Sequence, residues 1–214
     1  MPELQGAVSD RIMKNILLIF SLLLSSCVEY RKPELSIPDK TRDEIFQRFV
    51  NPLTDKYELK NLREEYLSGD DFEVRVWVTA FEIDGFILKR TTGNWSAVAI
   101  KEINCKEFNY YPKDKLYKLG KINLKTPKSG WQNTWQKLVE TGILDLPDSD
   151  DISYIDGMGY ATEINQNGKY RTYIYSNPNL QKTEEAKQMM KIGEIIADEF
   201  GLYNFKVSSL CLEK

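Results

Sequence analysis

Two dipeptides that end in glycine, Asp84-Gly85 and Asn167-Gly168, constrain the fold of this chain most. Each lies between segments in which apolar residues recur at about every second position, and such a pair favours the tight turn of a β-hairpin. A third alternating segment, 95–103, follows the turn residues Thr92-Gly93-Asn94, and a fourth spans 116–124. The chain therefore predicts an antiparallel meander, followed later by a separate hairpin.

The second hairpin allows a prediction of strand register. If Asn167-Gly168 is a two-residue turn, the residues on either side of it face each other across the two strands. Counting outward from the turn gives the pairs Gln166–Lys169, Ile164–Arg171, Thr162–Tyr173 and Tyr160–Tyr175. One face of this hairpin then carries three tyrosines and an isoleucine.

The tyrosines of this face are candidate ligand-binding residues. Planar groups of a sugar or peptide stack on tyrosine rings, and a nearby guanidinium adds a cation–π interaction. The same tyrosines also suit a core face beneath the last helix, which is the interpretation we favour. The candidate binding set is Tyr160, Arg171, Tyr173 and Tyr175.

Apolar residues at helical spacing predict three helices. In the second of these, Trp131 and Trp135 lie on one apolar stripe, which is more typical of core than of an exposed binding surface. The order helix, meander, helix, hairpin, helix predicts an α+β fold, with one antiparallel sheet and the helices packed on one face. The expected helices run from the capping box Thr41–Glu44 to a break or bend at Pro52, from Ser129 to Gly142, and from Thr183 to Gly201.

An apolar segment near the start of the chain carries information about location. Ile16 to Leu24 is nine residues long and follows Lys14, whereas a helix needs about 20 apolar residues to cross a bilayer. The run has the length of a signal-peptide core instead. With Leu24-Ser25-Ser26-Cys27 as its lipobox, the segment resembles the signal peptide of bacterial lipoproteins. A buried core helix with an incidental cysteine is the alternative interpretation.

The lipoprotein resemblance implies cleavage before Cys27 and attachment of diacylglycerol to its thiol, usually with a third acyl chain on the new amino terminus. We therefore expect a signal peptide over 1–26, for which Met13 is a better start than Met1. Residues 27–40 would form the lipidated cysteine and an extended tether, and 41–214 a single α+β domain. The expected location is the bacterial cell envelope. Because Val28 stands where enterobacterial lipoproteins carry a retention aspartate, we expect the outer membrane, facing the periplasm.

Composition excludes several classes of function. Histidine is absent, which removes Ser-His-Asp and Cys-His catalysis and histidine zinc sites. The net charge of −3 argues against a nucleic-acid partner, since nucleic-acid binding needs a basic surface. Besides Cys27, the chain has Cys105 and Cys211, which would either form a disulfide or remain two separate buried thiols.

Carboxylates supply the remaining candidate chemistry. Two facing carboxylates in strands could hydrolyse a glycan, but the spacing of the strand glutamates selects no pair. The acidic loop 148–156 departs from the EF-hand pattern, so we expect a solvated turn there and no metal or cofactor. We expect a non-enzymatic binding module with an envelope protein as partner. The alternative is a carboxylate-dependent hydrolase of envelope glycan or peptide. The strand glutamates are Glu73, Glu82, Glu102 and Glu163.

Overall fold

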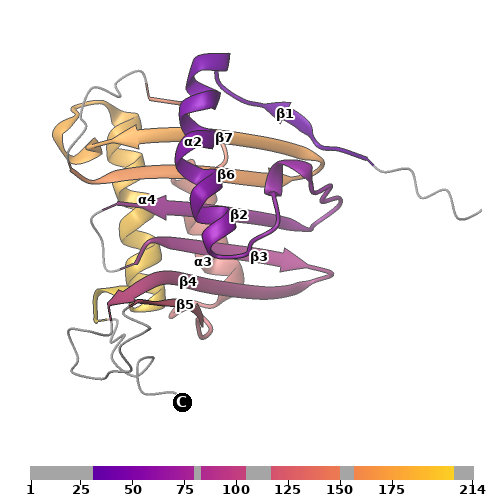
Figure 1. Ribbon diagram of the computed structural model, residues 1–214. Helices are drawn as coiled ribbons and strands as arrows, with labels where there is room; N and C mark the ends of the chain where they lie inside the picture. The colour runs from indigo at the N-terminus through magenta and orange to yellow at the C-terminus, as the bar shows by residue number, and fades with distance from the viewer. Residues whose placement is uncertain (1–30, 80–82, 105–116, 150–156, 205–214) are drawn as a thin grey trace, which may run out of the picture. The chain divides into compact units, whose positions relative to one another are not determined.

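The structure is a computed structural model that describes residues 31–79, 83–104, 117–149 and 157–204 (Figure 1). The chain divides into two units, residues 1–31 and 32–214, and the described strands and helices all belong to the second unit. In chain order they are β1 (Glu34–Ser36), α2 (Lys40–Lys56), the 3₁₀ turn η1 (Leu62–Glu64), β2 (Phe72–Val78), β3 (Gly85–Thr91), β4 (Asn94–Asn104), β5 (Tyr117–Asn123), α3 (Trp131–Glu140), β6 (Gly159–Gln166), β7 (Lys169–Ser176), η3 (Pro178–Leu180), α4 (Glu184–Phe200) and η4 (Leu202–Asn204).

One seven-stranded sheet contains both predicted groups of strands. Its order is β1-β7-β6-β2-β3-β4-β5, and every pair is antiparallel except β1 with β7. The meander β2–β5 and the hairpin β6–β7 are therefore confirmed, and β6 joins them by pairing with β2. The α+β class is confirmed as well. The lysine-bearing strand β5 lies at one edge of the sheet, where charged side chains discourage pairing with other chains.

The second hairpin has the register that its turn residues predict. Tyr160 pairs with Tyr175, Thr162 with Tyr173, and Gln166 with Lys169. Asn167 and Gly168 both have positive φ, 53° and 67°, as a type I′ turn requires. A local turn signal was sufficient here because a two-residue turn leaves one possible register.

The first hairpin differs from expectation in detail. Gly85 pairs with Trp77 inside the sheet, so Asp84-Gly85 is the start of β3 rather than the turn itself. A Cβ on Gly85 would lie 2.8 Å from the Trp77 ring, and glycine is therefore needed for this close approach. The Asp84 carboxylate accepts hydrogen bonds from Tyr57 Oη and from the Glu102 backbone N–H, which fixes the entry into β3.

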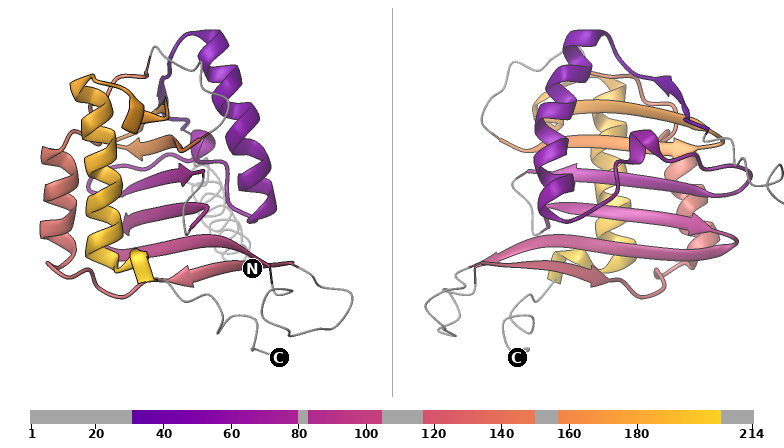
Figure 2. Two further views of the ribbon diagram at one scale, coloured as in Figure 1. Left: turned by 90° about the vertical axis from the view of Figure 1, so that its left-hand side faces the viewer. Right: turned by 45° about the vertical axis from the view of Figure 1, so that its right-hand side comes forward.

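The helices lie on both faces of the sheet, whereas we expected them on one. Figure 2 shows α2 on one side and α3 with α4 on the other. The reason lies in β2, which is buried on both faces: Phe72, Val74 and Val76 contribute to the core beneath α3 and α4. Trp77, which points the opposite way, joins a smaller core with Phe46 and Val50 of α2. Ile87 of β3 and Ile100 of β4 belong to the same smaller core, so the sheet has apolar residues on both faces and needs cover on both.

Capping residues set the helix boundaries, and the sequence pattern predicted only some of them. Helix α2 begins after Asp39, whose carboxylate accepts from the N–H groups of Thr41 and Arg42, and it continues past Pro52 to Lys56. Helix α4 has Thr183 as N-cap and a left-handed Gly201 at its end, as predicted. Helix α3 starts after Gly130 without a side-chain cap, because the Ser129 hydroxyl donates to Glu199 instead.

Part of the segment expected to be a tether belongs to the sheet. Glu34–Ser36 form β1, which runs parallel to β7, with Glu34 opposite Lys169. The backbone N–H of Glu34 also donates to the Gly168 carbonyl at 2.7 Å. These contacts give the outer edge of β7 a partner, which an edge strand otherwise lacks.

Candidate functional site

Two of the candidate glutamates, Glu73 of β2 and Glu163 of β6, are brought together on the sheet face that α2 covers. Arg75 lies between them, because it follows Glu73 by two positions on β2 and pairs with Glu163 across the strands. Its Nε donates to Glu73 Oε1 at 2.7 Å and its Nη1 to Glu163 Oε1 at 3.3 Å. The side chains of Arg75 and Glu163 are only 3% and 4% exposed. The arrangement is a buried Glu–Arg–Glu ion network.

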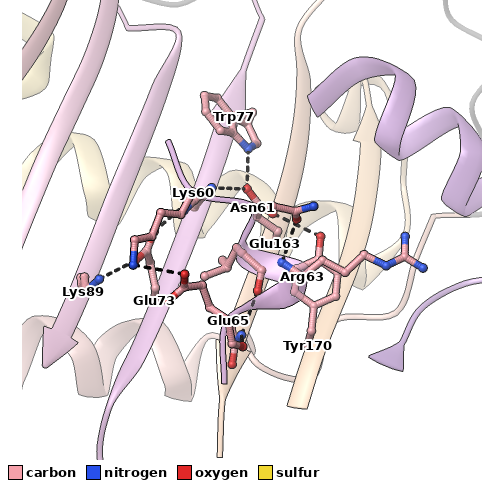
Figure 3. A network of polar contacts seen from close by, with 12 residues as sticks. Lys60, Asn61, Arg63, Glu65, Glu73, Trp77, Lys89, Glu163 and Tyr170 are labelled. Carbon is pink, nitrogen blue, oxygen red and sulfur yellow. Dashed lines mark hydrogen bonds and ion pairs between the residues drawn. The ribbon is translucent and has the colours of Figure 1, made fainter. Parts of the chain in front are cut away.

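Further donors complete the network around each carboxylate (Figure 3). Glu163 accepts from Trp77 Nε1 at 3.2 Å and from Tyr170 Oη at 3.2 Å. Lys89 Nζ lies 3.0 Å from the second oxygen of Glu73. All four carboxylate oxygens thus have donors, which is what burial of charged groups requires.

The two carboxyl groups respond to this environment in opposite directions. Burial raises the pKa of Glu163 above its ordinary value, although Arg75, Trp77 and Tyr170 all favour the charged form. Burial also disfavours the charged form of Glu73, but the nearby charges of Arg75 and Lys89 outweigh it, and the pKa of Glu73 is lowered. The neutral form is thus easier to reach at Glu163 than at Glu73.

Beside the network, a separate side-chain contact attaches η1 to the sheet. Asn165, opposite Glu73 in the register, donates from its side-chain amide to the backbone carbonyls of Leu62 and Glu65, which attaches η1 to β6. Its neighbourhood is closed, since the side chains of Glu73, Arg75 and Glu163 are all under 10% exposed. We interpret the network as structural, because substrate has no access to these carboxylates.

The candidate aromatic platform is buried. Tyr160, Tyr173 and Tyr175 are at most 3% exposed, so none of these rings presents a face for stacking. Tyr173 Oη donates to the Ile143 carbonyl and Tyr175 Oη to the Pro147 carbonyl, both at 2.9 Å. The guanidinium of Arg171 lies over the Tyr173 ring and donates to the Leu146 carbonyl. The three tyrosines are therefore core residues, as the favoured interpretation expected. Arg171, Tyr173 and Tyr175 attach β7 to the segment after α3.

Tryptophan residues form a second aromatic group, at the end of the sheet where β2 begins. The Trp135 ring stacks on Phe72 with centroids 4.1 Å apart, and the Trp131 ring stacks on Trp95 at 6.2 Å. All three tryptophans are partly buried against the main core. The apolar stripe of α3 is therefore used in packing the helix onto the sheet.

The other sequence candidates lie apart or outside the described residues. Glu102 pairs with Lys56 at 2.6 Å, and Asp148 accepts from Arg42 and from the Ile174 N–H. Among the described residues, no group of three or more histidine, cysteine, aspartate or glutamate side chains is placed to hold a metal ion. Outside the described residues are Cys27, Cys105, Cys211, Glu82 and most of the acidic loop, 150–156.

Sequence reasoning found Glu73 and Glu163 but not their connection through Arg75. The available signal was the strand Phe72–Val78, in which Glu73, Arg75 and Trp77 alternate with apolar residues. A strand that carries charges yet also a tryptophan on one face indicates that this face is covered and its charges paired.

Comparisons with known proteins identified no relative of this chain. The chain matches no protein-family model, and neither curated proteins nor solved structures show a significant match to it.

Proposed function

We propose that this chain is a lipid-anchored protein of the bacterial cell envelope whose α+β domain is a non-enzymatic binding module. The observation that carries the proposal is the short apolar segment that ends in Leu24-Ser25-Ser26-Cys27. Two or three acyl chains on Cys27 would hold the protein at a membrane without a spanning helix. Among the described residues, no helix is long and apolar enough to cross a membrane.

The position of β1 sets how far the domain can lie from such an anchor. Only six residues, 28–33, separate Cys27 from Glu34, the first residue of β1. At about 3.3–3.6 Å per residue, Glu34 lies no more than about 25 Å from Cys27, whatever the path of the chain. The full segment 27–40, as a free tether, would have allowed about 45 Å. The anchored domain would therefore lie close to the membrane surface.

The same connection joins the segment after Cys27 to one end of the sheet. Strand β1 begins beside Gly168, at the turn between β6 and β7, and runs parallel to β7. The end of the sheet at this turn is thus the end nearest Cys27 along the chain.

The carboxylate geometry does not favour the alternative of a glycan or peptide hydrolase. Such an enzyme needs two carboxyl groups that reach the scissile bond. Glu73 and Glu163 are buried and both are held by Arg75, so they are unsuited to this role. The proposal therefore rests on binding rather than hydrolysis.

A cysteine substitution tests the anchor. In a bacterial host, we expect the wild-type chain to incorporate a fatty-acid probe and to fractionate with the membrane, and Cys27→Ala to lose both properties. Cys105→Ala is the matched control and should keep both. Given Val28, density-gradient separation should place the wild type with the outer membrane. Labelling and membrane association that persist in Cys27→Ala would contradict the proposal.

A further inference from the structure

A cavity lies between the sheet and the carboxyl-terminal half of α4, on the face that α3 and α4 cover. Its volume is about 170 Å³. The sheet contributes Val76, Val78 and Phe86 to its wall, and α4 contributes Ile196 and Ala197. The end of β2 and the turn η4 border it, so it lies at the end of the sheet opposite Gly168.

The chemistry of the wall selects a neutral occupant. None of the described residues that line the cavity carries a charge, and all but the two tyrosines, Tyr160 and Tyr203, have apolar side chains or none. A charged ligand would lose its hydration without gaining a partner there. An enclosed apolar cavity of about 150 Å³ takes up benzene, and this cavity has a similar volume and a wall that is apolar apart from two tyrosines.

The Tyr160 hydroxyl group lies on this wall. It donates to Met158 Sδ at 3.5 Å, and its oxygen can also accept a hydrogen bond. A Cβ on Gly193 would lie 2.8 Å from Tyr160 Oη and 3.2 Å from its ring. Glycine in the middle of a helix makes the helix less stable than alanine does. We therefore attribute the glycine at position 193 to the close approach of Tyr160. Tyr203 is 57% exposed and also lines the cavity, which places the opening beside η4.

We propose that this cavity binds a small, neutral, mainly apolar molecule about the size of one aromatic ring, with one polar group that forms a hydrogen bond with the Tyr160 hydroxyl. This site goes beyond the proposed function and stands without it, because it depends only on the packing of β2, β3, β6, α4 and η4.

Three single-ring probes of similar size test the proposal. Benzene is apolar, phenol adds one hydroxyl group, and benzoate adds a charge. The protein is the full chain carrying Cys27→Ala, so that neither a lipid nor a detergent competes for the cavity. Ligand-observed NMR and thermal unfolding should show saturable binding of phenol and benzene in the millimolar range or tighter, with phenol preferred. Benzoate should not bind, and the Tm should rise with probe concentration only for the two neutral rings.

Variants assign the binding to this cavity. Ala197→Leu places three extra carbon atoms in the space and should abolish binding of both neutral probes. Gln188→Leu adds leucine to the exposed side of the same helix and should leave binding unchanged. Tyr160→Phe should remove the preference for phenol over benzene while benzene binding persists. If Ala197→Leu unfolds the chain, Ala197→Val, which adds less volume, replaces it, with binding expected to weaken at least tenfold.

Several results would contradict the proposed binding site. The proposal fails if neither neutral probe binds saturably, if benzoate binds as well as phenol, or if the folded Ala197 variants bind as the wild type does. If Tyr160→Phe binds phenol and benzene with the same affinities as the wild type, the Tyr160 hydroxyl group has no role in binding. None of these outcomes depends on lipidation, so failure here is distinguishable from failure of the anchor.

Discussion

The buried ion network makes a quantitative prediction for Arg75→Met. Methionine fills much of the same volume but lacks the guanidinium, so the buried Glu163 carboxylate keeps two neutral donors and loses its opposite charge. Removing one partner of a buried ion pair costs about 3–5 kcal/mol. Domains of this kind have a total stability of about 5–15 kcal/mol. We therefore expect the free energy of unfolding to fall by about 3–5 kcal/mol.

The loss should depend on pH with a definite sign. Burial already raises the pKa of Glu163 in the wild type, and Arg75 opposes that rise. Without Arg75 the folded-state pKa rises further, so the folded protein binds a proton that the unfolded chain has released. Stability of Arg75→Met should then decrease as pH rises from the ordinary glutamate value of 4.5 through the raised folded-state value. Its deficit relative to wild type should accordingly be smaller in mild acid than in mild alkali.

Urea unfolding followed by tryptophan fluorescence measures the loss, with a constant m-value as the check that two-state behaviour holds. Lys187→Met is the control, since it breaks the exposed pair with Glu184 and should cost less than about 1 kcal/mol. The double variant Arg75→Met/Glu163→Gln, which removes the orphaned charge, should show a coupling energy of about 0.5–3 kcal/mol. A deficit for Arg75→Met under about 1 kcal/mol, with no recovery in the double variant, would refute the network.

Two further predictions concern acid stability and a strained loop. Burial opposes the charged form of Glu199, but hydrogen bonds from Lys137 and Ser129 outweigh it and lower the pKa of Glu199 to about 2. Stability from this carboxylate is present above pH 4.5 and lost as pH falls towards about 2. The gap in unfolding free energy between wild type and Glu199→Gln should therefore narrow over this range, and a constant gap would contradict the assignment. Gly157 has φ of 134°, so Gly157→Ala should lower the free energy of unfolding by about 1–3 kcal/mol through the backbone conformation alone. The total loss should be larger, because a Cβ there would lie 1.8 Å from Asn177 Oδ1. Gly69→Ala is the comparison, with positive φ but open space, and thermal unfolding that ranks it as equally damaging would show that the contact with Asn177 carries no cost.

Local patterns predicted the strands and their nearest pairings. Alternation in β2 to β5 and the turn at Asn167-Gly168 act within a few residues, so the meander, the second hairpin and its register follow from neighbouring residues. Helix α4 was predicted at both ends because Thr183 and Gly201 are strong capping residues. These features depend on backbone geometry that the chain determines locally.

Long-range contacts account for what pattern did not predict. The pairing of β2 with β6 brings Glu163 beside Arg75, although they are 88 positions apart in the chain. No local signal specifies that pairing, so the sequence did not predict the ion network or the second covered face of the sheet. The three residues of β1 are too few to show alternation, and Pro33 and Pro38 on either side made the segment look like a tether. Similarly, the sequence predicts a helix that begins at Ser129, whereas Glu199 on a distant helix accepts from the Ser129 hydroxyl group and α3 begins at Trp131.

Mass spectrometry of the protein extracted from membranes tests the proposed lipid anchor. We expect the amino-terminal peptide to begin at Cys27 and to carry the mass of a diacylglycerol on its sulfur, usually with one further acyl group on its nitrogen. An amino-terminal peptide that still contains Ile16 to Ser26, with an unmodified thiol at Cys27, would contradict it.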